Sequence, residues 1–148
     1  MSVHGSKLVA QDSLILPVVW ERIEYFEAIR RAVLFLEKHL AERISEQEVA
    51  SVACLEQTAF SKVFRRRTGV TFREFVESLR LSRAIEGMLH SDQSLTEIAL
   101  AVGFVSLTNF GRAFRRRLGV APSTYRKILL KHNGLLPRDV ASEVPSTV

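Results

Sequence analysis

Two stretches of this chain repeat each other at an offset of fifty residues, which limits the fold to architectures built from two copies of one unit. Upstream, after one residue is dropped in the turn, Ser45 and Glu48 match Ser94 and Glu97. The other matches are two phenylalanines, a run of three arginines and a Gly-Val pair: Phe60, Phe64, Arg65, Arg66, Arg67, Gly69 and Val70 against Phe110, Phe114, Arg115, Arg116, Arg117, Gly119 and Val120.

The second copy indicates what the unit is. Ser94 and Glu97 form a capping-box pattern that starts a short helix, and Gly103 supplies a sharp turn after it. From Ser106 a second helix follows, with Leu107, Phe110, Phe114 and Leu118 on an apolar face and Thr108, Asn109, Arg112, Arg115 and Arg116 on a polar, basic face. This is the helix-turn-helix pattern, whose second, recognition helix enters the major groove of DNA.

The first copy departs from this pattern at its turn. Cys54 stands where the second copy has Gly103, and a non-glycine residue at positive φ costs about 1–2 kcal/mol. Either the first turn has a different geometry or it accepts that cost. As the single cysteine, Cys54 rules out an intramolecular disulfide, and we expect it to pack as a small apolar side chain.

The sequence from about Ile44 to Arg126 resembles the DNA-binding region of the AraC/XylS family of bacterial transcription regulators. The most specific matches are Glu-Ile-Ala-Leu-Ala-Val-Gly-Phe, ending at Phe104, and Phe-Gly-Arg-Ala-Phe-Arg-Arg-Arg-Leu-Gly-Val-Ala-Pro-Ser-Thr-Tyr-Arg, starting at Phe110. The resemblance implies an all-α fold of about seven helices, in which a long linker helix joins two helix-turn-helix subdomains. Family members are activators more often than repressors.

The expected organisation has three parts. Residues 1–17 are expected to be a flexible leader, residues 18–132 the DNA-binding domain, and residues 133–148 a disordered tail. Within the domain we expect a first long helix from about Val19 to Leu40. The first helix-turn-helix should span residues 45–67, the linker helix 72–90, the second helix-turn-helix 94–117, and a closing helix should run from Pro122 to about Lys131.

The charge distribution favours a polyanionic partner. The net charge is +5, yet residues 1–43 contain six basic and six acidic side chains. The segments 57–70 and 106–127 contain four and six basic side chains and no acidic one. A basic patch on a neutral body is typical of nucleic-acid binding. No run of about 18 apolar residues, metal-ligand spacing or catalytic motif is present, so we expect no membrane span, no metal, no cofactor and no enzymatic activity.

Individual contacts are implied by the resemblance, position by position, and agree with side-chain chemistry. Arginine and lysine suit guanine, and asparagine suits adenine. The expected base contacts are Thr58, Ser61 and Lys62 in the first recognition helix and Thr108, Asn109 and Arg112 in the second. The expected phosphate contacts are Gln57, Arg65, Arg66, Ser106, Arg115 and Arg116, with Arg67, Arg117, Arg126 and Lys127 as weaker candidates. For Gln57 and Ser106, which stand at the helix starts, helix capping is the alternative role.

The leading hypothesis is a sequence-specific transcription regulator, more typically an activator, that binds double-stranded DNA as one chain at an asymmetric site. RNA polymerase is a further expected partner, and the expected location is the bacterial cytoplasm, at the nucleoid. Two alternatives remain open. In the first, the chain is the DNA-binding part of a larger ligand-controlled regulator. In the second, it is a protein-interaction adaptor whose basic face meets an acidic partner.

Overall fold

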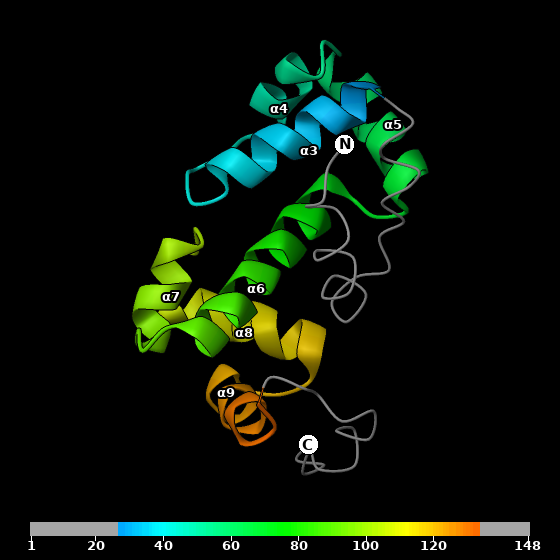
Figure 1. The fold of residues 1–148 in the computed structure, drawn as a ribbon. Helices are drawn as coiled ribbons and strands as arrows, with labels where there is room; N and C mark the ends of the chain where they lie inside the picture. The colour runs from blue at the N-terminus through cyan, green and yellow to red at the C-terminus, as the bar shows by residue number, and fades with distance from the viewer. Residues whose placement is uncertain (1–26, 134–148) are drawn as a thin grey trace. The chain divides into compact units, whose positions relative to one another are not determined.

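The computed structural model describes residues 27–133, and this part of the chain is all-helical (Figure 1). The prediction of an all-α fold with about seven helices is therefore confirmed. The helices are α3 (Glu27–His39), α4 (Glu46–Val52), α5 (Gln57–Thr68), α6 (Phe72–His90), α7 (Leu95–Ala101), α8 (Leu107–Leu118) and α9 (Pro122–Lys131). The predicted leader, most of the predicted tail and the expected helical residues before Glu27 lie outside the described range.

The chain divides into two compact units, with the division inside α6. The first unit ends at Arg83 and the second begins at Ala84. A capping box starts α6, since the Thr71 backbone N–H donates to the Glu74 carboxylate and the Glu74 N–H donates to the Thr71 hydroxyl. Each unit thus takes part of its structure from the same continuous helix.

The first unit is built from α3, α4, α5 and the beginning of α6 (Figure 1). The apolar spacing of α3 buries its inner stripe, including Ile29 and Leu36, as the sequence predicts. Against it packs an aromatic cluster in which the ring centroid of Phe64 lies 5.9 Å from that of Phe72 and 5.1 Å from that of Phe75. These edge-on contacts fix the inner face of α5.

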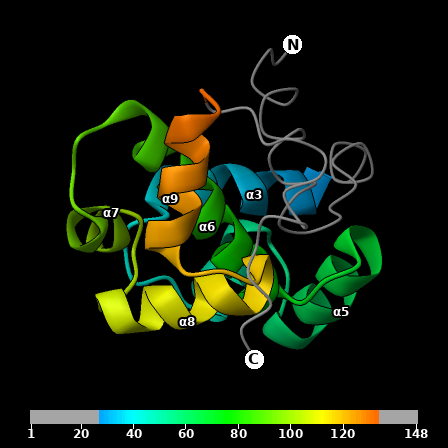
Figure 2. The ribbon, with the colours of Figure 1, turned by 90° about the horizontal axis from the view of Figure 1, so that it is seen from below.

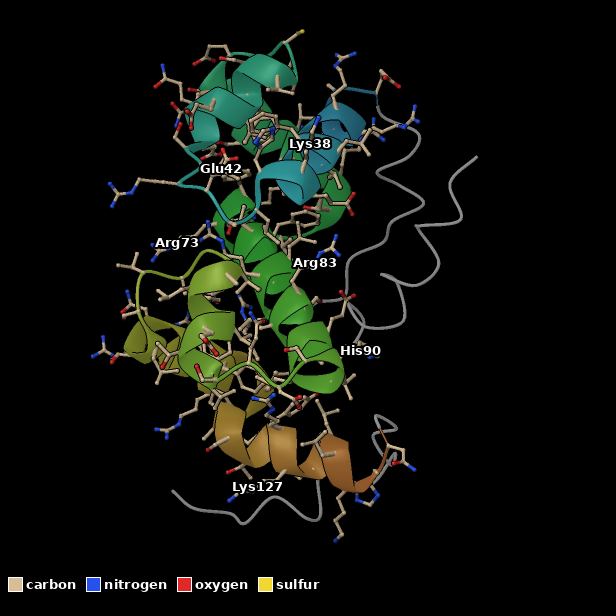
Figure 3. All side chains as sticks on the ribbon, turned by 60° about the vertical axis from the view of Figure 1, so that its left-hand side comes forward. Lys38, Glu42, Arg73, Arg83, His90 and Lys127 are labelled. Atoms are coloured by element: carbon tan, nitrogen blue, oxygen red, sulfur yellow. The ribbon has the colours of Figure 1, made fainter. Side chains whose placement is uncertain are left out.

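Two sets of polar contacts fix the start of α4 and the loop between α3 and α4. Ser45 and Glu48 form the predicted capping box at the start of α4, and the bonds from Ser45 to the carboxylate lower the pKa of Glu48. Arg80 of α6 donates to the backbone oxygens of Leu40 and Glu42, at 3.2 and 3.1 Å, in the loop after α3 where Figure 3 labels Glu42. Burial lowers the pKa of Arg80. The loop therefore enters α4 from a fixed position.

The second unit repeats this plan with α7, α8 and α9 (Figure 2). The Phe114 ring lies 5.5 Å from Phe110 and 5.2 Å from Tyr125, between centroids. Desolvation by burial raises the pKa of Tyr125 to about 12. Tyr125 stands fifty residues after Phe75, at the offset of the repeat, and both are buried in the aromatic core of their own unit.

The second unit also repeats the loop anchor. Arg126 of α9 donates to the backbone oxygens of Gln93 and Ser91, at 2.6 and 2.7 Å, just before the capping box of Ser94 and Glu97. The helix that carries this arginine has no side-chain cap at Ala121, because alanine has no side-chain acceptor, and it begins with Pro122. Arg80 in the first unit and Arg126 in the second therefore act alike. Each lies in the helix that follows α5 or α8, and each holds the loop that leads into α4 or α7.

The turns inside the two helix-turn-helix motifs have left-handed backbone at matching positions. Gly103 has φ of 104° and Cys54 has φ of 59°. The first turn therefore keeps the positive φ and accepts the strain of a side chain there, which resolves the alternative left open by the sequence. Cys54 is exposed, so the expectation that it packs as a small apolar side chain is wrong. Gly69 and Gly119 end α5 and α8 in the left-handed conformation that glycine favours at a helix end.

Candidate nucleic-acid interface

Helix α5 separates its side chains by chemistry. Phe60 and Phe64, four residues apart, are fully buried and tie the helix to the core of the first unit. The opposite face exposes Thr58 and Lys62. Gln57 and the three arginines Arg65, Arg66 and Arg67 are exposed as well. The outer face of α5 therefore offers polar and cationic groups to a ligand.

The start of α5 carries a carboxylate that sequence analysis did not identify. Glu56 is the N-cap residue, and its side chain accepts from the backbone N–H groups of Thr58 and Ala59, at 3.2 and 3.4 Å. The hydrogen bonds between Thr58 and this carboxylate are the main reason why the pKa of Glu56 is lowered. A negative charge there also complements the helix dipole. Gln57 is thus the first helical residue and stands next to a fixed anion.

Ser61 differs from the other expected base contacts of α5. It is half-buried, and its hydroxyl donates to the carboxylate of Glu46 in α4. The same hydroxyl oxygen lies 3.1 Å from the backbone oxygen of Gln57. Only the structure could identify this link, because Glu46 is fifteen residues away and the second copy has no carboxylate at the matching position.

Helix α8 has a sharper division between its faces. Phe110, Phe114 and Ala113 are buried, whereas Thr108, Asn109 and Arg112 are exposed. Arg115 and Arg116 are exposed near the end of the helix. Ser106 caps the start, where its side-chain oxygen accepts from the Asn109 N–H at 3.1 Å. The expected polar stripe of the second recognition helix is therefore on the outside.

The apolar face of α8 is shorter than the sequence indicated. Leu107, placed on that face by helical spacing, is 40% exposed, and its neighbour Val105 is 75% exposed. Leu107 is the first residue of α8, where no preceding turn covers it. The position of Leu107 directly after the N-cap Ser106 indicates this exposure, and helical spacing alone does not take that position into account. The start of α8 thus adds two exposed aliphatic side chains to the polar stripe.

Gly111 leaves an open position in the stripe, where the first copy has Ser61. A Cβ atom added there would meet no heavy atom within 4 Å. The surface beside Thr108 and Arg112 therefore has room at this point.

The weaker phosphate candidates separate clearly. Arg126 serves as the anchor of the loop before α7, so the expectation that it is a phosphate contact is not supported by its position. Lys127 is exposed on α9 (Figure 3) and Arg67 is exposed on α5, while Arg117 is half-buried.

Within residues 27–133, no helix is long and apolar enough to cross a membrane. The same residues contain no group of three or more metal-binding side chains.

The sequence matches known proteins over the two units. Residues 49–128 match a family profile described as a helix-turn-helix domain. The chain is 31% identical over 99 residues to the transcriptional activator RhaS of Escherichia fergusonii. The aligned region covers 67% of this chain and 36% of that protein. It is 35% identical over 92 residues to the probable transcriptional regulator LumQ of Photobacterium leiognathi, over 62% and 37% of the two chains. The chain spans about a third of the length of these relatives.

Solved structures share the fold. One is the DNA-binding domain of AdpA, solved in complex with a target DNA, with a TM-score of 0.66 and 28% identity over 70% of this chain and 93% of that chain. Another is a regulator with an AraC-type DNA-binding domain from Chromobacterium violaceum, with a TM-score of 0.64 and 24% identity over 68% and 89%.

Proposed function

This chain belongs to the AraC/XylS family of helix-turn-helix proteins, and from that premise we propose that it is a sequence-specific DNA-binding transcription regulator. One observation carries the proposal. In each unit the phenylalanines of the recognition helix form the core, which turns the basic, acid-free face of α5 and of α8 to the outside. The structure of AdpA with its target DNA supports double-stranded DNA as the ligand of this fold.

We propose that base edges are contacted by one set of side chains in each unit. Arg112 can form two parallel bonds with guanine and Asn109 with adenine, while Lys62 can donate to guanine acceptors. Thr58 and Thr108, both exposed, supply hydroxyls that suit several bases. Ser61 completes the set in the first unit, and Leu107 and Val105 can touch a thymine methyl group in the second.

The phosphate contacts form a second set. Arg65, Arg66, Arg115 and Arg116 are exposed in the last turns of α5 and α8, where they can anchor the backbone of DNA without reading its sequence. Ser106 and Gln57 lie at the helix starts. We expect Ser106 to bind phosphate more readily than Gln57, because the carboxylate of Glu56 beside Gln57 repels an anion.

The two units carry different side chains at their reading positions, as Ser61 against Gly111 illustrates. We therefore propose that one chain binds an asymmetric site, with each recognition helix in its own major-groove segment. The relatives named as activators support activation. We propose RNA polymerase as a further partner and the bacterial cytoplasm, at the nucleoid, as the location. Because the matched region makes up only 36% of the relative RhaS, this chain's DNA-binding role also fits the corresponding part of a ligand-controlled regulator.

The test is selection of duplexes from a random library by the full chain, followed by variants on the selected site. Arg112→Ala should relax the preference at one base pair by about 1–3 kcal/mol. Arg115→Ala should weaken all sites alike and reduce the salt slope of binding by about one. Lys38→Ala, which removes an exposed cation of α3 (Figure 3), is the matched control and should change neither property.

The results separate DNA reading from other roles. A basic adaptor for acidic proteins would bind all duplexes with a similar affinity, whatever their sequence. Failure to enrich any sequence, or protection only of a symmetric palindrome by an obligate dimer, would contradict the proposal.

A further inference from the structure

The hydroxyl of Ser61 is an expected base contact whose proton is engaged by another helix of the protein. It donates to the Glu46 carboxylate of α4, and the second acceptor within reach, the Gln57 backbone oxygen at 3.1 Å, also belongs to the first unit. A serine hydroxyl has one proton to donate and two lone pairs that accept. The Glu46 carboxylate is the stronger acceptor of the two, because a hydrogen bond to an ionised group is about twice as strong as a neutral one. With its proton held there, Ser61 can only accept from a ligand, whereas the weaker bond to the Gln57 oxygen leaves the proton free to turn toward one.

The fold does not require this link. When the two capping boxes are matched, Glu46 corresponds to Leu95, and the recognition helices match Ser61 with Gly111. The second unit therefore lacks both partners, yet it has the same capping box and the same buried phenylalanine pair. A pair that occurs in one copy and is dispensable in the other points to a role outside packing.

The chemistry of the major groove indicates which bases such a hydroxyl can select. Adenine and cytosine present amino groups that donate, whereas thymine and guanine present oxygens that accept. A free serine hydroxyl suits either kind, so by itself it discriminates poorly. A hydroxyl whose proton is held by a carboxylate keeps only the acceptor role, and the charge-assisted bond behind it is about twice as strong as a neutral one.

We infer that Glu46 is a positioning residue which makes Ser61 an acceptor-only contact, so that α5 selects an adenine or cytosine amino group at one base position. The inference rests on the proposed function, since it concerns how one contact of that function gains its specificity. Glu46 needs no contact with DNA to act in this way, because it works through the orientation of the Ser61 proton.

The experiment compares the full chain with three variants by library selection and by affinity for the selected duplexes. Ser61→Ala should lose the adenine or cytosine preference at one base pair and leave the others unchanged. Glu46→Leu, which introduces the residue of the second copy, should relax that same pair about tenfold toward thymine or guanine. Glu46→Gln should relax it too, because an amide can donate to the Ser61 oxygen and free its proton.

Two further measurements separate this role from a structural one. Melting temperature and the salt slope of binding should be similar for Glu46→Leu and the parent chain, whereas the base preference should differ. In the Glu46→Leu background, Ser61→Ala should have a smaller effect on discrimination than in the parent chain.

Three outcomes would overturn the inference in different ways. If Glu46→Leu keeps the preference that Ser61→Ala loses, Ser61 selects its base without Glu46. If Ser61→Ala alters no base pair, Ser61 is not a base contact, while the proposed function still stands as long as Arg112→Ala relaxes its own pair. If the parent chain enriches no duplex, the inference fails together with the proposed function.

Discussion

Replacing Cys54 by glycine should stabilise the first unit, because this residue has a side chain where the backbone is left-handed. Its φ is 59°, and the conformation is held by the Cys54 N–H bond to Ser51 and the Leu55 N–H bond to Ala50, at 3.0 and 2.9 Å between nitrogen and oxygen. The matching turn of the second unit has Gly103 at φ 104°. The Cys54→Gly variant removes the Cβ atom and leaves these bonds available.

The magnitude follows from two opposing terms. A non-glycine residue in the left-handed region costs about 1–2 kcal/mol. Glycine loses more backbone entropy on folding, which offsets about 0.5–1 kcal/mol of that gain. Because Cys54 is exposed, little packing is lost with its side chain. The net gain in free energy of unfolding is about 0.5–1 kcal/mol, and in a unit of this size it raises the melting temperature by about 2–8 °C.

The assay is thermal and urea unfolding followed by circular dichroism, with Cys54→Ala as the matched control. Alanine removes the thiol and keeps Cβ, so it should leave the strain and the melting temperature close to those of the parent chain. The reasoning would be refuted if the glycine variant were no more stable than the alanine variant.

Two other predictions concern stability. Arg126→Ala should destabilise the second unit by about 1.5–3 kcal/mol, because the guanidinium no longer bonds to the Ser91 and Gln93 oxygens, and urea unfolding measures the loss; a change no larger than that of Lys127→Ala on the same helix would speak against it. Acidification should destabilise both units, since the capping bonds lower the pKa of Glu48 and of Glu97 below the ordinary value of 4.5 in the folded state. Their contribution is present above about pH 4.5 and is lost as pH falls through the lowered pKa, so Glu48→Gln with Glu97→Gln should make the melting temperature depend less on pH between about 5.5 and about 3; parallel curves for the variant and the parent chain would count against it.

Local signals predicted most of the fold. The phenylalanines at four-residue spacing are fully buried, and the three capping boxes form where the Ser/Thr-x-x-Glu patterns stand. Such features depend on residues within one or two helical turns, which a sequence displays directly. The exposure of Asn109 and Arg112 follows in the same way, because both lie opposite the buried face of α8.

The remaining features depend on residues far apart in the sequence. Arg80 anchors a loop forty residues upstream at the Leu40 oxygen, and Arg126 does the same at Ser91, thirty-five residues upstream. Neither link follows from a local pattern, and the charge of Arg126 by itself indicates a phosphate contact rather than a loop anchor. Leu107 was misplaced for a different reason, since helical spacing assigns a face but not whether a neighbouring turn covers the first residue.

The empty space at Gly111 makes the second recognition helix open to redesign. A Cβ atom added there would meet no heavy atom within 4 Å, and replacing a helical glycine by alanine gains about 0.5–1 kcal/mol. Residues with longer polar side chains, such as glutamine, should therefore be accepted there without harm to folding. This position is where new DNA targets could be acquired, in the laboratory or by mutation in nature, while the rest of the protein stays as it is.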